Sequence, residues 1–225
     1  AGMVERVDIE SEDLRTVHDA FTRMRHGALK RNELEWEEYW RWEADDVLVA
    51  VYYDEEEEPK GYLVYYISND VFRIKELVTI NQEARHGLWN YISAHYTMIE
   101  KVVGTNYTNE PMAFLLEDSE IQEEIEPNVM ARIVDFEAFI KKYPFDIISI
   151  HDDLHFVIDD PVMECNCGDF SLRWDKEGNT IIERGGTQGE TVRCDIQTLT
   201  AMFYGYKRPT YLKRVERLRA SEDAV

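Results

Sequence analysis

The sequence predicts an α+β fold made of two successive units. In the first half of the 225 residues, the expected order is helix, helix, β-hairpin, strand, helix and strand. The second half is mainly short β-runs joined by Gly, Asp and Asn turns, and it ends in two helices. Apolar residues make up 44% of the chain, enough to bury a core in each half. The predicted boundary separates residues 1–127 from residues 128–225.

Two helices are expected near the start of the chain. Ser11 has the position of an N-cap, and apolar side chains recur after it every three or four residues. Gly27 is expected to end this helix. Asn32 is expected to cap a second helix over residues 32–44, which is rich in aromatic residues and contains Trp36.

Three β-rich runs follow. The segments 46–54 and 60–68 flank a run of glutamates, which predicts an antiparallel hairpin with an acidic tip. The segment 72–80 predicts a third strand. Asn81 is expected to cap the next helix, and the segment 99–107 predicts another strand.

The remaining elements are shorter. A turn or helix is expected after Pro111, a strand over 129–134, and an amphipathic helix over 136–142 that Pro144 ends. The second half is expected to contain β-runs at 153–160, 169–184 and 189–196, followed by two helices broken at Gly205 and Pro209.

The connection from the third strand into the next helix is a usual place for a coenzyme phosphate, because a helix N-terminus offers free N–H groups. In the run TINQEARHGLW, Gly87 is the single glycine, and it lies about one turn inside the helix. Glu83 lies in the first turn, where its carboxylate would repel a diphosphate. We therefore expect this site to have been lost.

The charge is strongly negative, with 46 acidic against 25 basic residues and a net charge of −21. This surface argues against binding of nucleic acid or an anionic membrane, and it favours a cationic partner or simple solubility. Three cysteines, Cys165, Cys167 and Cys194, fit a reducing cytoplasm better than a disulfide framework. No apolar run reaches the roughly 18 residues that a membrane span requires.

Several long runs carry a family resemblance. They are LEWEEYW (34–40), KGYLVYYI (60–67), IKELVTINQEARHGLW (74–89), NEPMAFLL (109–116), MARIVDFEAFIKKYPF (130–145) and DIQTLTAMFYGYKRPTYL (195–212). In these runs and in their order, the chain resembles the Eis (enhanced intracellular survival) family of GNAT N-acetyltransferases. The resemblance implies an N-terminal GNAT domain that binds acetyl-CoA, a second, degenerate GNAT-like domain, and a domain like sterol carrier protein. This chain resembles the second and third parts.

The resemblance also implies a function. The parent enzyme would transfer acetyl from acetyl-CoA to a primary amine of a cationic acceptor, such as an aminoglycoside or a polyamine. Acetyl-CoA would be bound by the parent's N-terminal GNAT domain and not by this chain, so we assign no catalytic, cofactor or metal residue here. Trp36 matches a tryptophan that faces the acceptor pocket in this family, and we assign it as substrate-binding; the alternative is a core tryptophan. The chain would supply a wall of the pocket and contacts in a homo-oligomer. The alternative function is a non-catalytic lipid-binding or interaction module of the sterol carrier type.

Other residues have two interpretations each. Glu76 lies either near a splayed pair of strands or in a cross-strand pair. Arg132 is expected to form a salt bridge between the domains. On a strand, His151 and His155 would lie roughly 13 Å apart, too far for one metal ion. The aromatic segment 202–206 either lines a lipid tunnel or packs on its own sheet, and helical spacing favours packing.

Overall fold

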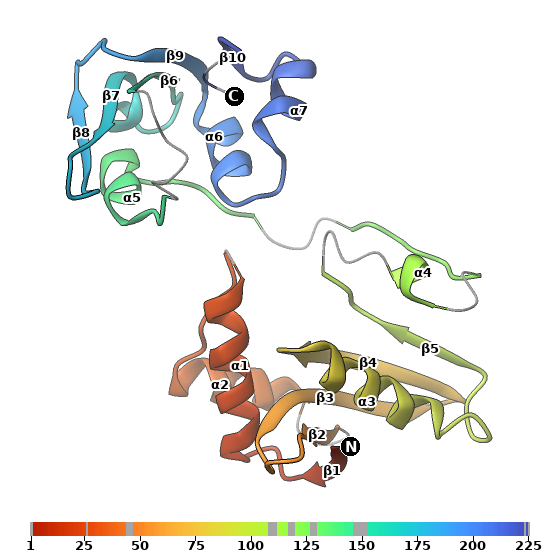
Figure 1. Ribbon diagram of the computed structural model, residues 1–225. Coiled ribbons are helices and arrows are strands. Elements are labelled where there is room, and N and C mark those ends of the chain that lie inside the picture. Colours follow the sequence, from red (N-terminus) through yellow and green to blue (C-terminus); the bar gives the residue numbers. More distant parts are fainter. Residues whose placement is uncertain are drawn as a thin grey trace. The chain divides into compact units, whose positions relative to one another are not determined.

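The computed structural model describes most of the chain: residues 2–25, 27–43, 47–107, 112–116, 120–126, 130–145, 153–222 and 224. These residues form two compact units, Ala1–Ile121 and Gln122–Val225 (Figure 1). The boundary predicted between residues 127 and 128 falls among residues 127–129, outside the described ranges. Each unit has its own five-stranded sheet and its own helices, so the predicted α+β class is confirmed.

The first unit contains most of the long elements. They are β1 (Met3–Val7), α1 (Glu12–Met24), α2 (Glu33–Glu43), β2 (Leu48–Tyr53), β3 (Pro59–Ser68), β4 (Val71–Thr79), α3 (Gln82–Ser93), β5 (Lys101–Gly104) and α4 (Met112–Leu115). The strands follow the order β1-β2-β3-β4-β5, and every pair is antiparallel except β4 with β5. Strand β1 was not expected, because half-exposed and polar residues give it no clear apolar alternation.

The predicted N-caps of the three long helices are present. Ser11 accepts a hydrogen bond from the N–H two residues on, at 3.3 Å, and Asn81 accepts one from the N–H three residues on, at 2.8 Å. Asn32 and Glu35 form a reciprocal capping box, with bonds of 3.1 and 2.7 Å. Local side-chain chemistry therefore decides where each of these helices begins.

Helices cover both faces of the first sheet. Helices α1 and α2 pack on one face through Leu14, Val17, Phe21 and the ring of Trp36, against Val64 and neighbouring strand residues. Helix α3 packs on the other face, where Leu88 and Ile92 meet side chains of β2, β3 and β4. The sheet is thus buried on two sides, which explains the nearly continuous apolar runs of β2 and β3.

Gly87 has a packing role on α3. A Cβ atom at this position would lie 2.3 Å from two ring carbons of Tyr52 on β2, closer than real contacts allow. Across the same interface, a Cβ at Gly61 would lie 3.0 Å from Ala84. The lone glycine of the helix is therefore explained by close approach of α3 to the sheet.

Gly87→Ala tests this contact. Alanine normally stabilises an exposed helix position by about 1 kcal/mol relative to glycine. Here we expect destabilisation of about 1–3 kcal/mol, because the methyl group displaces the Tyr52 ring. The measurement is chemical unfolding followed by tryptophan fluorescence, since four of the five tryptophans lie in the first unit. In a Tyr52→Leu background the effect of Gly87→Ala should shrink or reverse; stabilisation in the wild-type background would contradict the packing role.

The second unit is built around a mixed sheet. Its elements are α5 (Phe136–Lys142), β6 (Leu154–Asp159), a 3₁₀ helix (Glu164–Asn166), β7 (Gly168–Trp174), β8 (Thr180–Arg184), β9 (Glu190–Asp195), α6 (Ile196–Phe203), α7 (Pro209–Arg214) and β10 (Arg219–Ala220). The strand order is β10-β9-β6-β7-β8, and β6 with β9 is the parallel pair. The three predicted β-runs, the β7–β8 hairpin and both late helices are confirmed; the two-residue β10 was not expected.

The strand predicted over 129–134 is wrong for the described part of that segment. Residues 130–134 have no strand pairing. Ile133 is buried, and its N–H donates instead to Oγ1 of Thr200 on α6, at 3.2 Å. The backbone N–H of Ile133 is thus bonded to a helix side chain and not to a neighbouring strand. The local sequence does not reveal this partner.

Asp160 is the centre of a buried polar network in the second unit. Its side chain is 0% exposed and accepts bonds from Arg132 at 2.5 Å and from Asn166 Nδ2 at 2.9 Å. The N–H groups of Val162 and Met163 also donate to it, each at 3.0 Å. Burial alone would raise the pKa of Asp160, but these donors outweigh it and hold the pKa well below its usual range. The expectation that Arg132 bridges the two domains is wrong, because its partner belongs to the same unit.

Acid should weaken the second unit through Asp160. Because the folded state lowers its pKa, the carboxylate stabilises the fold fully above its unfolded pKa of about 3.9, and this contribution is lost as the pH falls below that value. Asp160→Asn should cost about 3–5 kcal/mol at pH 7, because it leaves Arg132 without its charge partner. Calorimetry between pH 7 and pH 3 checks both points. Glu177→Gln, at an exposed position of the β7–β8 turn, is the control; an equal loss there would contradict the role of Asp160.

Candidate functional site

The N-terminus of α3 is closed by the chain's own side chains. Asn81 takes up the N–H of Ala84, and the carboxylate of Glu83 accepts a hydrogen bond of 2.6 Å from the Tyr52 hydroxyl. Burial and then the bond to Glu83 raise the pKa of Tyr52 to about 12, so this phenol stays protonated. A diphosphate at this helix end would meet the charge of Glu83 and, behind it, the Tyr52 ring packed on Gly87. These residues do not fit a coenzyme diphosphate.

Strands β4 and β5 separate partway along their length. Their parallel pairing runs from Val71 with Lys101 to Ile74 with Gly104 and stops there. Among the described residues, the β4–β5 ladder does not extend beyond Ile74, although β4 continues to Thr79. Gly104 marks the last point of close approach, since a Cβ there would lie 2.7 Å from Ile74.

A β-bulge lies at the point where the two strands part. Val64 of β3 pairs with Glu76, whereas the next residue, Tyr65, pairs with Ile74, so the register shifts there and Lys75 is the extra residue of β4. The extra residue reverses which face the following side chains take. Ile74 packs under α3, whereas Val78 packs under α1 and α2. Glu76 is therefore directed to the α1–α2 face.

Glu76 meets Arg31 on that face. The guanidinium donates two bonds to the carboxylate, Nη1 to Oε2 at 3.0 Å and Nη2 to Oε1 at 2.9 Å. The side chains of Arg31 and Glu76 are only 21% and 15% exposed. The guanidinium carbon also lies 4.7 Å from the ring centre of Trp36 and 4.3 Å from that of Tyr39. We call Arg31, Glu76, Trp36 and Tyr39 the Arg31 cluster.

Two buried groups adjoin the Arg31 cluster. His18 contacts Trp36 edge-on, with ring centres 5.0 Å apart, and burial followed by the charge of Arg31 lowers its pKa, which keeps the imidazole neutral near pH 7. The pKa of Tyr62 is raised well above its usual value, by burial and then by the charge of Glu76. Arg31 and Glu76 thus form an ion pair in surroundings that favour the neutral forms of His18 and Tyr62.

Trp36, the one site residue assigned from the sequence, is 3% exposed and packs in the core under α1 and α2. A cation does lie over its ring, and that cation is Arg31 of the same chain. Contact of Trp36 with an acceptor stays a prediction. The backbone of Glu76 pairs with Val64 across the strands, and its side chain forms an ion pair with Arg31 of the loop. Sequence reasoning missed Arg31, because its partner is set by the bulge and the local sequence carries no sign of it.

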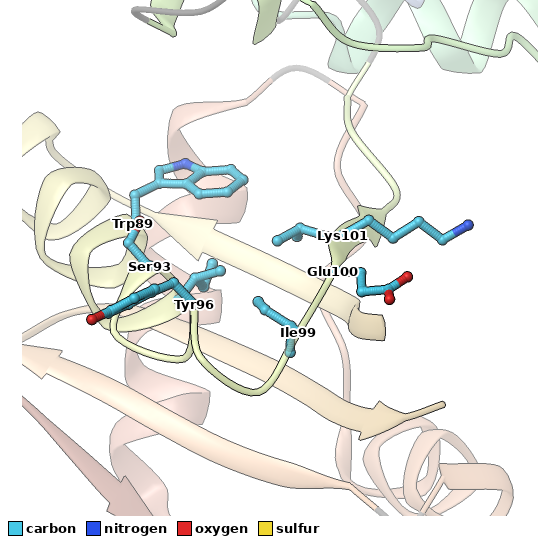
Figure 2. Close-up of a pocket in the computed structure, with 8 residues that line it drawn as sticks. Trp89, Ser93, Tyr96, Ile99, Glu100 and Lys101 are labelled. Atoms are coloured by element: carbon cyan, nitrogen blue, oxygen red, sulfur yellow. The ribbon is translucent and has the colours of Figure 1, made fainter. Parts of the chain in front are cut away.

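A separate groove of about 370 Å³ lies at the other end of α3 (Figure 2). Its lining is Trp89, Ile92, Ser93, Tyr96, Ile99, Glu100, Lys101 and Val102. The figure shows Trp89 and Tyr96 on the α3 side, facing Ile99 and Lys101 on the β5 side. The groove therefore lies beside the paired ends of β4 and β5, away from the N-terminus of α3. Its lining combines aromatic and aliphatic side chains with Ser93, Glu100 and Lys101.

The second unit uses its candidate residues for packing and hydrogen bonding. His155 bonds Asp169 through Nε2 at 2.7 Å and Thr191 through Nδ1 at 3.2 Å; His151 lies outside the described residues. Within the part of the chain that is described, no group of three or more His, Cys, Asp or Glu residues could hold a metal ion. Phe203 is buried among Phe139, Tyr143 and neighbouring rings, so this residue packs the core.

Comparisons with known proteins identify a domain type for each half of the chain. Residues 27–133 match the profile of the acetyltransferase (GNAT) domain, and residues 136–225 match that of the sterol carrier protein domain. The predicted fold, a GNAT-like domain followed by a sterol carrier protein-like domain, is confirmed. None of the proteins of curated function matches the chain. Among the described residues, no helix has the length and apolar character to cross a bilayer.

Solved structures resemble both units together. A probable N-acyltransferase from Enterococcus faecalis V583 shares 26% identity at a TM-score of 0.87, over 98% of this chain and 56% of that one. A GCN5-related N-acetyltransferase from Anabaena variabilis (22% identity, TM-score 0.75, 99% and 58% covered) and Eis1 from Mycobacterium abscessus (17%, 0.70, 99% and 57%) share the fold. The chain thus spans little more than half the length of each of these proteins.

Deletion of Lys75 tests how faces are assigned across the bulge. Without the extra residue, Ile74 and Glu76 become neighbours, and regular alternation keeps them opposite Tyr65 and Val64, so Glu76 still faces Arg31. Glu76→Gln, which leaves Arg31 without its charge partner, should cost about 3–5 kcal/mol in the first unit, measured by urea unfolding with tryptophan fluorescence. The deletion should cost clearly less, and Lys75→Ala, which keeps the bulge, should change stability by less than about 1 kcal/mol. A loss from the deletion as large as that from Glu76→Gln would contradict this assignment.

Proposed function

We propose that this chain, a GNAT-like domain followed by a sterol carrier protein-like domain, is part of an Eis-type N-acetyltransferase. Its substrate would be a primary amine on a cationic acceptor, such as an aminoglycoside or a polyamine. Acetyl-CoA would be bound by a further GNAT domain outside this chain. The chain would contribute one wall of the acceptor pocket, including Trp36, and contacts between subunits of a homo-oligomer in the cytoplasm.

One observation carries the proposal. The chain aligns over 98% of its length with a probable N-acyltransferase at 26% identity, yet it spans 56% of that protein. GNAT domains typically use acetyl-CoA, but the α3 N-terminus of this GNAT-like domain does not fit a diphosphate, because Glu83, Asn81 and Tyr52 fill it. Acyl transfer therefore calls for a coenzyme site elsewhere, and the additional length of the relatives gives room for one.

The charge of the chain supports a cationic acceptor. With a net charge of −21, the chain raises the local concentration of cations and slows the approach of anions. Along α2, Glu33, Glu37 and Glu38 are exposed on the helix that also holds Trp36. An acceptor with several ammonium groups would be attracted to this helix, most strongly at low ionic strength, where salt screens exposed charges least.

The transfer of acetyl to an amine would proceed by direct attack. A base takes a proton from the ammonium group, the free amine attacks the thioester carbonyl, and backbone donors stabilise the oxyanion. We place none of these catalytic groups on this chain. A lipid-binding role of the second unit is the alternative, and the packing of Phe203 into the core gives that alternative no support.

Binding measurements with the chain alone test the proposal. By calorimetry we expect no saturable acetyl-CoA binding tighter than about 1 mM, and no acetylation of polyamines or aminoglycosides. Addition of an N-terminal GNAT domain in trans should restore turnover. A fluorescent fatty acid serves as the comparison ligand.

Each outcome decides between alternatives. Tight acetyl-CoA binding by the chain alone would contradict our account of the α3 N-terminus. Fatty-acid binding without acetylation in the reconstituted mixture would favour the sterol carrier alternative. A matched control is Glu83→Gln, which removes the repelling charge but leaves the Tyr52 ring against Gly87; we expect it to stay unable to bind acetyl-CoA.

A further inference from the structure

The Arg31 cluster has the form of a ligand site filled by the chain itself. Glu76 accepts two parallel bonds from the guanidinium at 3.0 and 2.9 Å, and the rings of Trp36 and Tyr39 lie within 4.7 Å of its carbon. Proteins commonly recognise a guanidinium group in this way: a carboxylate accepts two parallel hydrogen bonds from it, and aromatic rings lie against its face. The geometry would suit a free ligand as well as it suits Arg31.

Arg31 enters the cluster from an exposed connection. It belongs to the segment between α1 and α2, where Leu29 is 81% exposed, and its own side chain keeps 21% exposure. The next residue, Asn32, begins α2 with its capping box, so the helix does not depend on where the Arg31 side chain lies. The side chain can therefore leave by rotation about its own bonds while both helices stay in place.

The site needs a cation whenever Arg31 leaves. Glu76 is 15% exposed, and an unpaired carboxylate at that depth is costly. His18 does not supply the charge, because burial is the main cause of its lowered pKa and remains when Arg31 departs. At 15% exposure, water solvates the Glu76 carboxylate only partly. Another cation of suitable shape can replace Arg31 without leaving this carboxylate unpaired.

We propose that Glu76, Trp36 and Tyr39 form a binding site for the guanidinium group of an alkylguanidinium ligand, with Arg31 as its intramolecular competitor. An alkylammonium is the poorer ligand, since a point-like ammonium cannot match the two-oxygen fork. This site goes beyond the proposed function: it concerns binding alone, and it holds or fails whether or not the chain takes part in acyl transfer.

Competition by Arg31 makes a quantitative prediction. A tethered side chain acts at a millimolar effective concentration, so the apparent affinity of wild type is reduced by the fraction of molecules in which Arg31 is in place. Arg31→Ala should therefore bind ethylguanidinium at least about tenfold more tightly than wild type. Glu76→Gln, which keeps the shape of the site but removes its charge, should abolish saturable binding in both backgrounds.

The indole N–H of Trp36 reports on the site directly. In ¹⁵N-labelled protein, its NMR signal is assigned by its disappearance in Trp36→Phe. Wild type is titrated with ethylguanidinium chloride to about 50 mM, above the effective concentration of a tethered competitor. Ethylammonium chloride and sodium chloride at equal ionic strength are the controls. We expect a saturable shift with ethylguanidinium, a weaker response to ethylammonium, and a linear or absent response to sodium.

The same titration is run on Arg31→Ala, Glu76→Gln and the double variant, with circular dichroism to verify that each is folded. The proposal is overturned if wild type gives no saturable shift, if Glu76→Gln binds as wild type does, or if Arg31→Ala gains no affinity. If Arg31→Ala does not fold, the comparison of wild type with Glu76→Gln decides. Failure of acetyl transfer in the reconstituted enzyme leaves these binding results unaffected, so the two proposals are separable.

Discussion

The β-bulge at Lys75 is the feature on which the arrangement of the first unit depends. One extra residue in β4 changes the face of the side chains that follow it, so that Ile74 lies under α3 while Glu76 and Val78 lie under α1 and α2. The bulge also coincides with the end of the β4–β5 pairing. A single local irregularity thus sets the position of the buried carboxylate, the separation of the strands and the site that Arg31 fills.

The opposite face of the same sheet is governed by close packing. Tyr52 lies against Gly87, and its hydroxyl reaches Glu83, so one side chain occupies both the contact surface and the first turn of α3. In a coenzyme-binding GNAT domain that turn would be kept free for phosphate oxygens. Here it is closed by a tyrosine and a carboxylate. The two faces therefore differ. On one, the chain's own side chains block the helix end where an anion would bind; on the other, Arg31 fills the site where a cation would bind.

The second unit is stabilised by an aromatic core and a buried hydrogen-bond network. Its core is a cluster of aromatic rings around Phe203, and its polar counterpart is the buried Asp160 with four donors. Arg132 enters this network from a segment without regular secondary structure. The network ties the entry segment of the unit to the end of β6, so the unit is anchored by hydrogen bonds where it has no helix or strand to do so.

The sequence by itself determined the α+β class, the helices and their caps, and most strands, because caps and apolar periodicity act over a few residues and survive in any tertiary context. It also indicated that the α3 N-terminus is unsuited to a diphosphate, since Glu83 and the misplaced Gly87 are visible locally. Only the tertiary structure decided the partners of Glu76 and Arg132, the burial of Trp36 and the absence of a strand at 130–134. The three pairings join residues at least 28 positions apart: Arg31 with Glu76, Arg132 with Asp160, and Ile133 with Thr200. Such pairs are brought together by sheet register, and a one-residue bulge that no local pattern announces was enough to choose between two faces.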